Sequence, residues 1–462
     1  MAQTKALAIT ILVAVVFAAL GYLAGQMTAP RTGATVTVTS YATVTSYVTV
    51  SRTVTPTTSP VAVPEKITIG LTLGLSGAYS YASTQGLRGI QIAVKWINEV
   101  YGGINLGGKK VKIELKYYDD QSNKELVPSL YEQLIKVDKV DFLLGPYGSP
   151  LVFVAAPVAE KYGKLMINWM GTSDVIHEQG YKMIVMVSTH SGSQMKPAME
   201  MVKSLDPNAK VAIIYKEDEH NRLLAQGARE AAKQLGLQVV FDKSYPVDIK
   251  DFTPIFTEMA TYKPDVIVIC PHEADGILAA TQLAELNINA KLMIMGFVPS
   301  LASFKRALGN LAEGWAGTNQ WSVGASYTPD DAKALGYEWF GPTEEEVLNL
   351  YKQIAPPEDF PSEHTGAGAA AVLILAKAIE KAQSLDPQVV RNTLNTMKVM
   401  TFYGPFQIDP TTGKQIAHKE ILSQWQQGKF VPIWPPEIAL SKPVYPIPTW
   451  DEKRQGKQAV PS

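Results

Sequence analysis

A strand, a helix and a second strand follow one another in residues 67–120, and this unit restricts the fold more than any other stretch. Apolar residues alternate with small or polar ones over 67–73, which predicts a strand, and recur at helical spacing over 87–97. After a glycine-rich turn at 101–108, residues 111–117 predict a second strand. A helix that connects two strands in this way is typical of a parallel sheet covered by helices.

The same alternation of strands and helices continues along the chain in two sets. The first set ends with a strand at 183–187, and the second runs from a strand at 211–215 to one at 292–295. A chain of 462 residues is long for one core. We therefore predict an α/β fold with two doubly wound parallel-sheet lobes.

Several segments in one order carry a resemblance to a known family. They include LSGAYSYASTQGLRGIQIAVKWINE, FLLGPYGSP, APVAEKYGKLMINWMGTS and YGPFQIDPTTGK. Together these segments resemble solute-binding proteins of the branched-chain amino acid type. These are type I periplasmic binding proteins of ABC importers. The form that this chain resembles is archaeal-like and membrane-anchored. The resemblance covers residues 65–434 and implies a three-strand hinge, with crossings between the lobes near 187, 317–320 and 404.

The composition of the two ends and the resemblance over residues 65–434 together predict the division of the chain. We expect a membrane anchor or signal segment, a Ser/Thr-rich stalk, two discontinuous lobes and an exposed tail. The anchor or signal segment covers 1–30, and the stalk covers 31–64. Lobe 1 combines 65–188 with 320–403, and lobe 2 combines 189–319 with 404–440. The tail covers 441–462.

The N-terminal region predicts an association with the membrane. Residues 6–25 are twenty residues without a charge, long enough to span a hydrocarbon core of about 30 Å. A retained transmembrane anchor is favoured over a cleaved signal peptide, because the apolar run exceeds a usual signal core. The Ser/Thr/Val-rich stalk that follows is either a plain spacer or an O-glycosylated one.

Composition excludes several classes of protein. The formal net charge of −1 gives no basis for binding nucleic acid. Cys270 is the only cysteine, so the chain has no internal disulfide, and its apolar neighbours predict a buried, inert thiol. Motifs for nucleophilic, nucleotide or metal chemistry are absent, so we expect no enzyme activity, no cofactor and no metal.

Ligands of open parallel sheets collect at the loops that follow the strands. That rule selects residues 74–83, 145–150, 169–173, 216–223, 270–275 and 296–300. Ser149 and Thr172 lie in these loops, and their hydroxyl and N–H groups suit a carboxylate or an amide. Ser149 could equally cap the helix that follows it. The aromatic ring of Tyr147 is suited to a pocket mouth.

The resemblance adds further candidate ligand contacts. Ser149 and Thr172 match the family's contacts to the ligand's carboxylate and amino group, and Met170 and Gly171 match its backbone contacts. The family's tyrosine falls on the alanine after Tyr81, so Tyr81 is its nearest substitute.

The predicted second lobe departs from the family pattern. His220 and His272 occupy aromatic positions and could donate hydrogen bonds to a polar or anionic ligand. Val298 stands where amino-acid binders place an acidic partner for the ammonium, which puts an amino acid ligand in doubt. Glu273, Asp275 and Glu363 are the candidate replacements for that carboxylate.

These observations predict an extracytoplasmic receptor of an ABC importer. It would bind a small amino acid, amide or carboxylic acid between closing lobes and deliver it to the permease and ATPase subunits. We expect a monomer. The alternative is a membrane-anchored sensor with the same fold, although such a sensor needs an output domain and only five residues precede the apolar segment.

Overall fold

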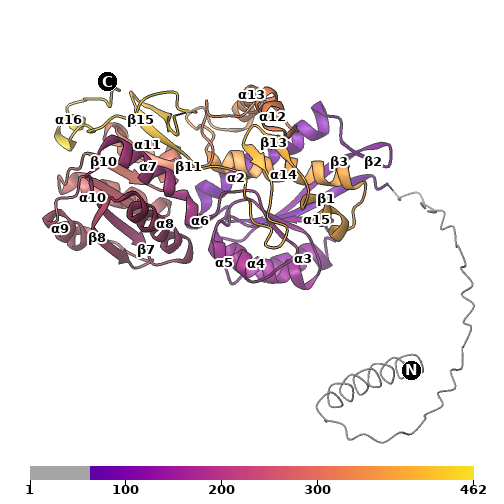
Figure 1. The fold of residues 1–462 in the computed structure, drawn as a ribbon. Helices are drawn as coiled ribbons and strands as arrows, with labels where there is room; N and C mark the ends of the chain where they lie inside the picture. Colours follow the sequence, from indigo (N-terminus) through magenta and orange to yellow (C-terminus); the bar gives the residue numbers. More distant parts are fainter. Residues whose placement is uncertain (1–62, 437, 462) are drawn as a thin grey trace, which may run out of the picture. The chain divides into compact units, whose positions relative to one another are not determined.

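The computed structural model describes residues 63–436 and 438–461, which belong to one compact unit, Ser59–Ser462 (Figure 1). The predicted membrane segment at 6–25 and the predicted stalk lie outside the described residues. Among the helices that are described, none is long and apolar enough to cross a membrane.

The first lobe is built on a six-stranded sheet. Its strands, in spatial order, are β2 (Ile104–Leu106), β3 (Lys109–Asp119), β1 (Lys66–Leu73), β4 (Phe142–Leu144), β5 (Met166–Asn168) and β6 (Ile184–Met186). From β3 to β6 the pairing is parallel, as predicted. At the edge, β2 pairs antiparallel with β3, so part of the predicted turn at 101–108 is instead a hairpin strand.

Helices cover both faces of this sheet. They are α2 (Ser80–Lys95), which continues as a π-helix (Trp96–Val100), α3 (Val127–Lys136), α4 (Ser149–Lys161), α5 (Asp174–Glu178), α12 (Pro329–Leu335), α13 (Glu344–Ile354), α14 (Glu363–Ala382) and α15 (Pro387–Leu394). In β4, Phe142 and Leu144 face the apolar cluster that includes α2 and α14, whereas Leu143 faces the cluster of α3 and α4. Burial on both faces explains why this strand is wholly apolar.

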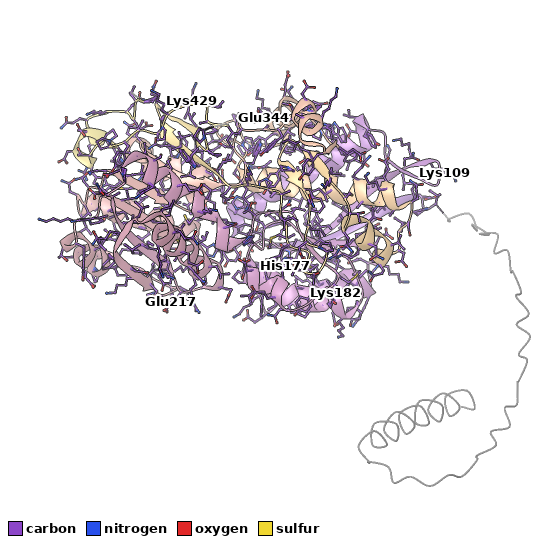
Figure 2. All side chains as sticks on the ribbon, in the orientation of Figure 1. Lys109, His177, Lys182, Glu217, Glu344 and Lys429 are labelled. Atoms are coloured by element: carbon purple, nitrogen blue, oxygen red, sulfur yellow. The ribbon has the colours of Figure 1, made fainter. Side chains whose placement is uncertain are left out.

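The second lobe contains a seven-stranded sheet. Its order is β16 (Lys429–Trp434), β15 (Ile421–Gln426), β11 (Trp315–Asn319), β10 (Leu292–Met295), β9 (Val266–Cys270), β7 (Lys210–Lys216) and β8 (Gln238–Tyr245). Strands β11 to β8 are parallel, and β15 and β16 add an antiparallel edge. Lys429, labelled in Figure 2, is the first residue of β16, the outermost strand.

Helices also surround the second sheet. They are α6 (Ser191–Gln194), α7 (Lys196–Leu205), α8 (Glu219–Leu235), α9 (Thr253–Thr261), α10 (Glu273–Glu285), α11 (Ala302–Leu308) and α16 (Trp450–Arg454), with short 3-10 turns at Val298–Ser300 and Gly309–Ala312. Cys270 ends β9 and is fully buried, as predicted. Burial raises the pKa of its thiol, which keeps the thiol protonated and unreactive.

The chain passes between the lobes after β6, after β11 and between β14 (Gly404–Phe406) and β15. The third passage lies later than the sequence indicated. Strand β14 pairs antiparallel with β13 (Val399–Thr401), and a third strand, β12 (Glu338–Trp339), completes a small sheet. Phe406 packs in the first lobe's core, so residues 404–408 belong with that lobe.

The C-terminal segment is not the exposed extension that its composition predicted. Val444, Ile447 and Trp450 are buried, and the last two belong to the apolar core of the second lobe. The Ile447 N–H donates to the carbonyl of Lys291 at 2.9 Å. In Figure 1 this yellow segment lies with the second lobe. Apolar residues three positions apart give the segment a face that packs, despite its many prolines.

Helices α2 and α14 approach each other backbone to backbone. A Cβ atom on Gly89 would lie 1.9 Å from the carbonyl oxygen of Thr365, and one on Gly368 would lie 2.4 Å from that of Gly86. Glycine is therefore required at these crossing points. The contact fixes the first turn of α14, which reaches the boundary between the lobes.

Candidate functional site

A small cavity lies where the strand-end loops of the two lobes meet. It is lined by Tyr147, Gly148, Ser149, Met170, Thr172, Gln194, His220, His272, Phe297, Gln320, Glu363 and His364. Its volume is about 20 Å³, and one water molecule needs about 10–15 Å³. A solute of amino-acid size can therefore enter only if the lobes or these side chains move.

Four helices begin at this cavity. Ser149 is the first residue of α4, His220 lies in the first turn of α8, His272 precedes α10, and Glu363 and His364 open α14. The N-terminus of a helix presents free N–H groups and the positive end of its dipole. Their convergence favours an anionic or hydrogen-bond-accepting ligand group.

Ser149 connects two loops of the first lobe and does not cap its own helix. Its Oγ accepts a hydrogen bond from the Ser173 N–H at 3.0 Å, and no side-chain cap forms at α4. The hydroxyl hydrogen of Ser149 therefore remains available as a donor. Gly148 precedes it with a φ of 88°, a conformation that favours glycine.

Thr172 joins the first lobe to His220 of the second. Its Oγ1 lies 3.0 Å from His220 Nδ1 and 3.0 Å from Ser191 Oγ, and Ser191 Oγ lies 2.8 Å from the same nitrogen. These contacts occupy Nδ1 and leave Nε2 of His220 for a ligand. Burial is the main reason why the pKa of His220 is lowered to about 4, and neighbouring His272 adds to this effect. The imidazole is therefore neutral at pH 7 and a weak base.

The imidazole ring of His272 is buried close to Asp218 in the described part of the chain. The residue is 7% exposed. Its Nε2 atom lies 3.2 Å from Asp218 Oδ2. Burial alone would raise the pKa of Asp218, but His272 and the Asn221 N–H hold that pKa well below its usual value. The Nδ1 atom of this buried ring has no hydrogen-bonding partner among the described residues, which suits it to bind a polar ligand group.

The first turn of α14 supplies an acid and a third imidazole. Glu363 Oε2 accepts from the Gln320 N–H at 2.7 Å, and His364 Nε2 lies 3.1 Å from the Tyr147 hydroxyl. Burial raises the pKa of Glu363 to about 8, although the Gln320 N–H favours the charged form. The pKa of Glu420 is also raised well above its usual value, mainly by burial and further by the nearby Glu363. Burial lowers the pKa of His364 to about 3.

Most of the residues predicted to contact ligand come together at this cavity. Those on its lining are Tyr147, Ser149, Met170, Thr172, His220 and His272. Tyr81 is not on the lining, because its hydroxyl turns away to donate to Asp359 at 2.9 Å. Gly171 is also off the lining, since its N–H and carbonyl both bond to the Asn168 side chain.

The structure distinguishes between candidate replacements for the acidic residue that the family places at the position of Val298. Val298 is buried and lies off the lining. Asp275 is likewise off the lining, with its carboxylate accepting from Tyr245, Lys216 and the His272 N–H. Glu363 is the one carboxyl residue on the described lining.

Five lining residues did not follow from the sequence as individual residues. Gly148 and Phe297 lie in two of the selected loops, 145–150 and 296–300, and Gln320 lies at a predicted crossing between the lobes. His364 follows Glu363, so helical proximity was its available signal. Gln194 lies after the first crossing, where no motif marked it.

The comparisons with known proteins agree with this architecture. The model of a family described as "Periplasmic binding protein" matches residues 66–429. The chain is 23% identical over 381 residues to Leu/Ile/Val-binding protein homolog 7 of Brucella suis, covering 79% of this chain and 91% of that protein.

Two solved structures show the same fold. A leucine binding protein of Thermotoga maritima matches with a TM-score of 0.68 at 20% identity, covering 80% of this chain and 98% of the other. A solute binding protein of R. palustris in complex with 4-hydroxybenzoate matches with a TM-score of 0.66 at 22% identity, covering 79% and 95%.

A two-lobed α/β fold with a cavity between the lobes defines the class of binding proteins. The chain belongs to the periplasmic binding protein family, which matches it over most of its length. The family-level expectation from the sequence is thereby confirmed. Membership of this family implies an extracytoplasmic location.

Proposed function

We propose that this protein is the solute receptor of an ABC importer, and that it captures its ligand by closure of the two lobes. The cavity between the lobes carries this proposal. It is lined by polar groups of both lobes, yet its volume of about 20 Å³ admits no organic solute without opening. Opening at the three connections and closing over ligand is the hinge motion that such a site requires.

The ligand that suits this site is a small carboxylic acid, an amide or an unusual amino acid. Its acid end would meet the Ser149 and Thr172 hydroxyls at the start of α4, and the imidazoles of His220 and His272 would donate from the second lobe. No arginine or lysine lies on the described lining, so neutral donors and helix N-termini supply the attraction. For a ligand with an ammonium group, Glu363 is the available partner.

The partners and the membrane attachment extend this proposal. The permease and ATPase subunits would receive the ligand from the closed receptor. The apolar segment at 6–25 would hold the receptor at the outer face of the membrane, unless it is removed as a signal peptide. Comparing the mass of the mature protein from membranes with that of the full sequence distinguishes the two.

Calorimetric titration of the full chain tests the proposal. Leucine, glutamate, urea and 4-hydroxybenzoate serve as probes, and we expect saturable binding of at least one. Replacing Ser149 with alanine should weaken that binding roughly tenfold or more, because a hydrogen bond to a charged group is worth about 1.5–3 kcal/mol. The control is Ser129→Ala on the exposed side of α3, which should bind as the wild type does.

Two results would count against parts of this proposal. If leucine binds tightly and Glu363→Gln abolishes that binding, a carboxylic acid or an amide is excluded as the ligand in favour of an amino acid. Binding that is equally strong in the Ser149→Ala variant would show that the ligand's acid end does not lie at α4.

A further inference from the structure

Four charged or polar side chains join the lobes outside the cavity. Asp359 Oδ1 accepts from Arg306 Nη1 at 2.8 Å and from the Tyr81 hydroxyl at 2.9 Å. Asp359 Oδ2 accepts from Arg88 Nη1 at 2.8 Å. The Arg306 guanidinium also lies over the Tyr81 ring, 5.2 Å from its centroid. We call Arg306, Asp359, Tyr81 and Arg88 the clasp.

The clasp draws its members from both lobes. Arg306 lies on α11, whose Phe304 and Leu308 pack in the second lobe's core. Tyr81 and Arg88 lie on α2, and Asp359 lies between α13 and α14, all three helices being part of the first lobe's core. Arg306 is thus the one member that comes from the second lobe.

Asp359 is held in place by its own lobe. Its side chain is 6% exposed, and both Arg88 and Tyr81 donate to it independently of Arg306. Burial alone would raise the pKa of Asp359, but the two arginines hold that pKa below its usual value. The first lobe therefore presents a fixed, charged carboxylate to the arriving arginine, which reduces the entropy lost on pairing.

A chain of hydrogen bonds links the clasp to the ligand cavity. The Tyr81 hydroxyl accepts from Gln85 Nε2 at 3.0 Å, and Gln85 Oε1 accepts from Thr365 Oγ1 at 2.9 Å. Thr365 lies in the first turn of α14, directly after Glu363 and His364 on the cavity lining. The clasp therefore adjoins the helix end that the ligand would meet.

We propose that Arg306 is a positioning residue that retains the ligand by clasping the second lobe onto Asp359 when the lobes close. This inference rests on the proposed function, because it assigns a stabilising contact to the closed form of that receptor. Arg306 is not on the described cavity lining, so it would act on the balance between open and closed forms. A pair of this exposure should change that balance about fivefold.

Distance measurements between spin labels test the clasp without any ligand. Labels at Lys161→Cys and Lys233→Cys, on the exposed C-terminal ends of α4 and α8, report the separation of the lobes in the full chain. The native Cys270 is buried and does not compete for label. Arg306→Ala should raise the ratio of open to closed molecules about fivefold, which appears as a larger population at longer distances. Arg306→Lys should restore part of the closed population.

The control removes a cation from the same helix. Lys305 pairs with Glu313, also of the second lobe, at 3.3 Å, so Lys305→Ala should leave the distances unchanged. The thermal unfolding temperature of Arg306→Ala should stay close to that of the wild type. Identical distance distributions for Arg306→Ala and the wild type would overturn the clasp. The ligand titration of the wild type tests the receptor function separately.

Discussion

Glu363 shows most directly how burial determines the chemistry of a single side chain at this site. It is 3% exposed, and its carboxylate accepts a hydrogen bond from the Gln320 N–H. Burial disfavours the ionised form of this carboxyl more than the Gln320 N–H favours it, which raises its pKa. At neutral pH we therefore expect Glu363 to be a neutral acid that can donate a hydrogen bond to a ligand.

The raised pKa of Glu363 predicts how stability depends on pH. The folded protein holds this proton up to about pH 8, whereas the unfolded chain releases it near the usual value of about 4.3. The contribution of Glu363 to the free energy of unfolding is therefore full at low pH. It is lost as pH rises toward 8, by no more than about 1.4 kcal/mol per pH unit.

Glu363→Gln should remove this loss. We expect the free energy of unfolding of the wild type to fall relative to that of the variant between pH 5 and pH 8, as measured by urea denaturation. Using the difference between the two proteins cancels the titration of the buried histidines. A difference that does not change with pH would show that Glu363 is ionised in the folded protein.

The residues of the site could be predicted where a general rule located them. The strand-end rule selected the loops that hold Ser149, Thr172, His220 and His272, and these residues line the cavity. Tyr81 lies off the described lining, and neither spacing nor resemblance shows which way a side chain turns. Its hydroxyl turns to Asp359, a residue 278 positions away in the chain.

At the scale of elements, the α2–α14 contact positions the site. The glycines let α14 approach α2 closely enough for its first turn to reach the cavity. Helical periodicity predicted both helices, but the pairing brings together segments that are far apart in sequence. Hydrophobic patterns do not indicate such long-range partners, so this contact could not be predicted.

Gly89→Ala should therefore disrupt the first lobe. The added methyl would lie 1.9 Å from the Thr365 carbonyl oxygen, so the helices must separate. We expect a loss of about 1–3 kcal/mol in the free energy of unfolding, together with weaker ligand binding. Gly296→Ala is the control, because its Cβ would meet Leu224 at an ordinary 3.7 Å. Equal stability of both variants would contradict the close helix contact.

At the scale of the whole molecule, the C-terminal segment completes the second lobe. Trp450 is fully buried, and its indole N–H donates to the Ile288 carbonyl at 2.7 Å. Its proline-rich composition suggested exposure, because composition reports average solvation and not the few apolar residues that pack. The fold class and the two lobes followed from periodicity, whereas this segment and the third passage between lobes depended on tertiary contacts.

Trp450→Ala tests the role of that segment. We expect a loss of about 3–5 kcal/mol in the free energy of unfolding, as for other large aromatic residues removed from a core. Exposed Asp451→Ala on the same short helix should cost far less. Urea denaturation followed by tryptophan fluorescence gives both values, and a small effect at Trp450 would mean that the segment is only loosely attached.

The three passages between the lobes also set the order in which the protein can fold. Helix α2 is made early, but its partner α14 follows only after the chain has passed through the second lobe up to β11. The first lobe cannot bury its core until that later segment arrives, and β15 must then return to the second sheet. Such long-range closure is intrinsically slow and leaves apolar surface exposed for longer. We therefore expect the nascent chain to leave part of its apolar surface unburied until α14 and β15 have been synthesised.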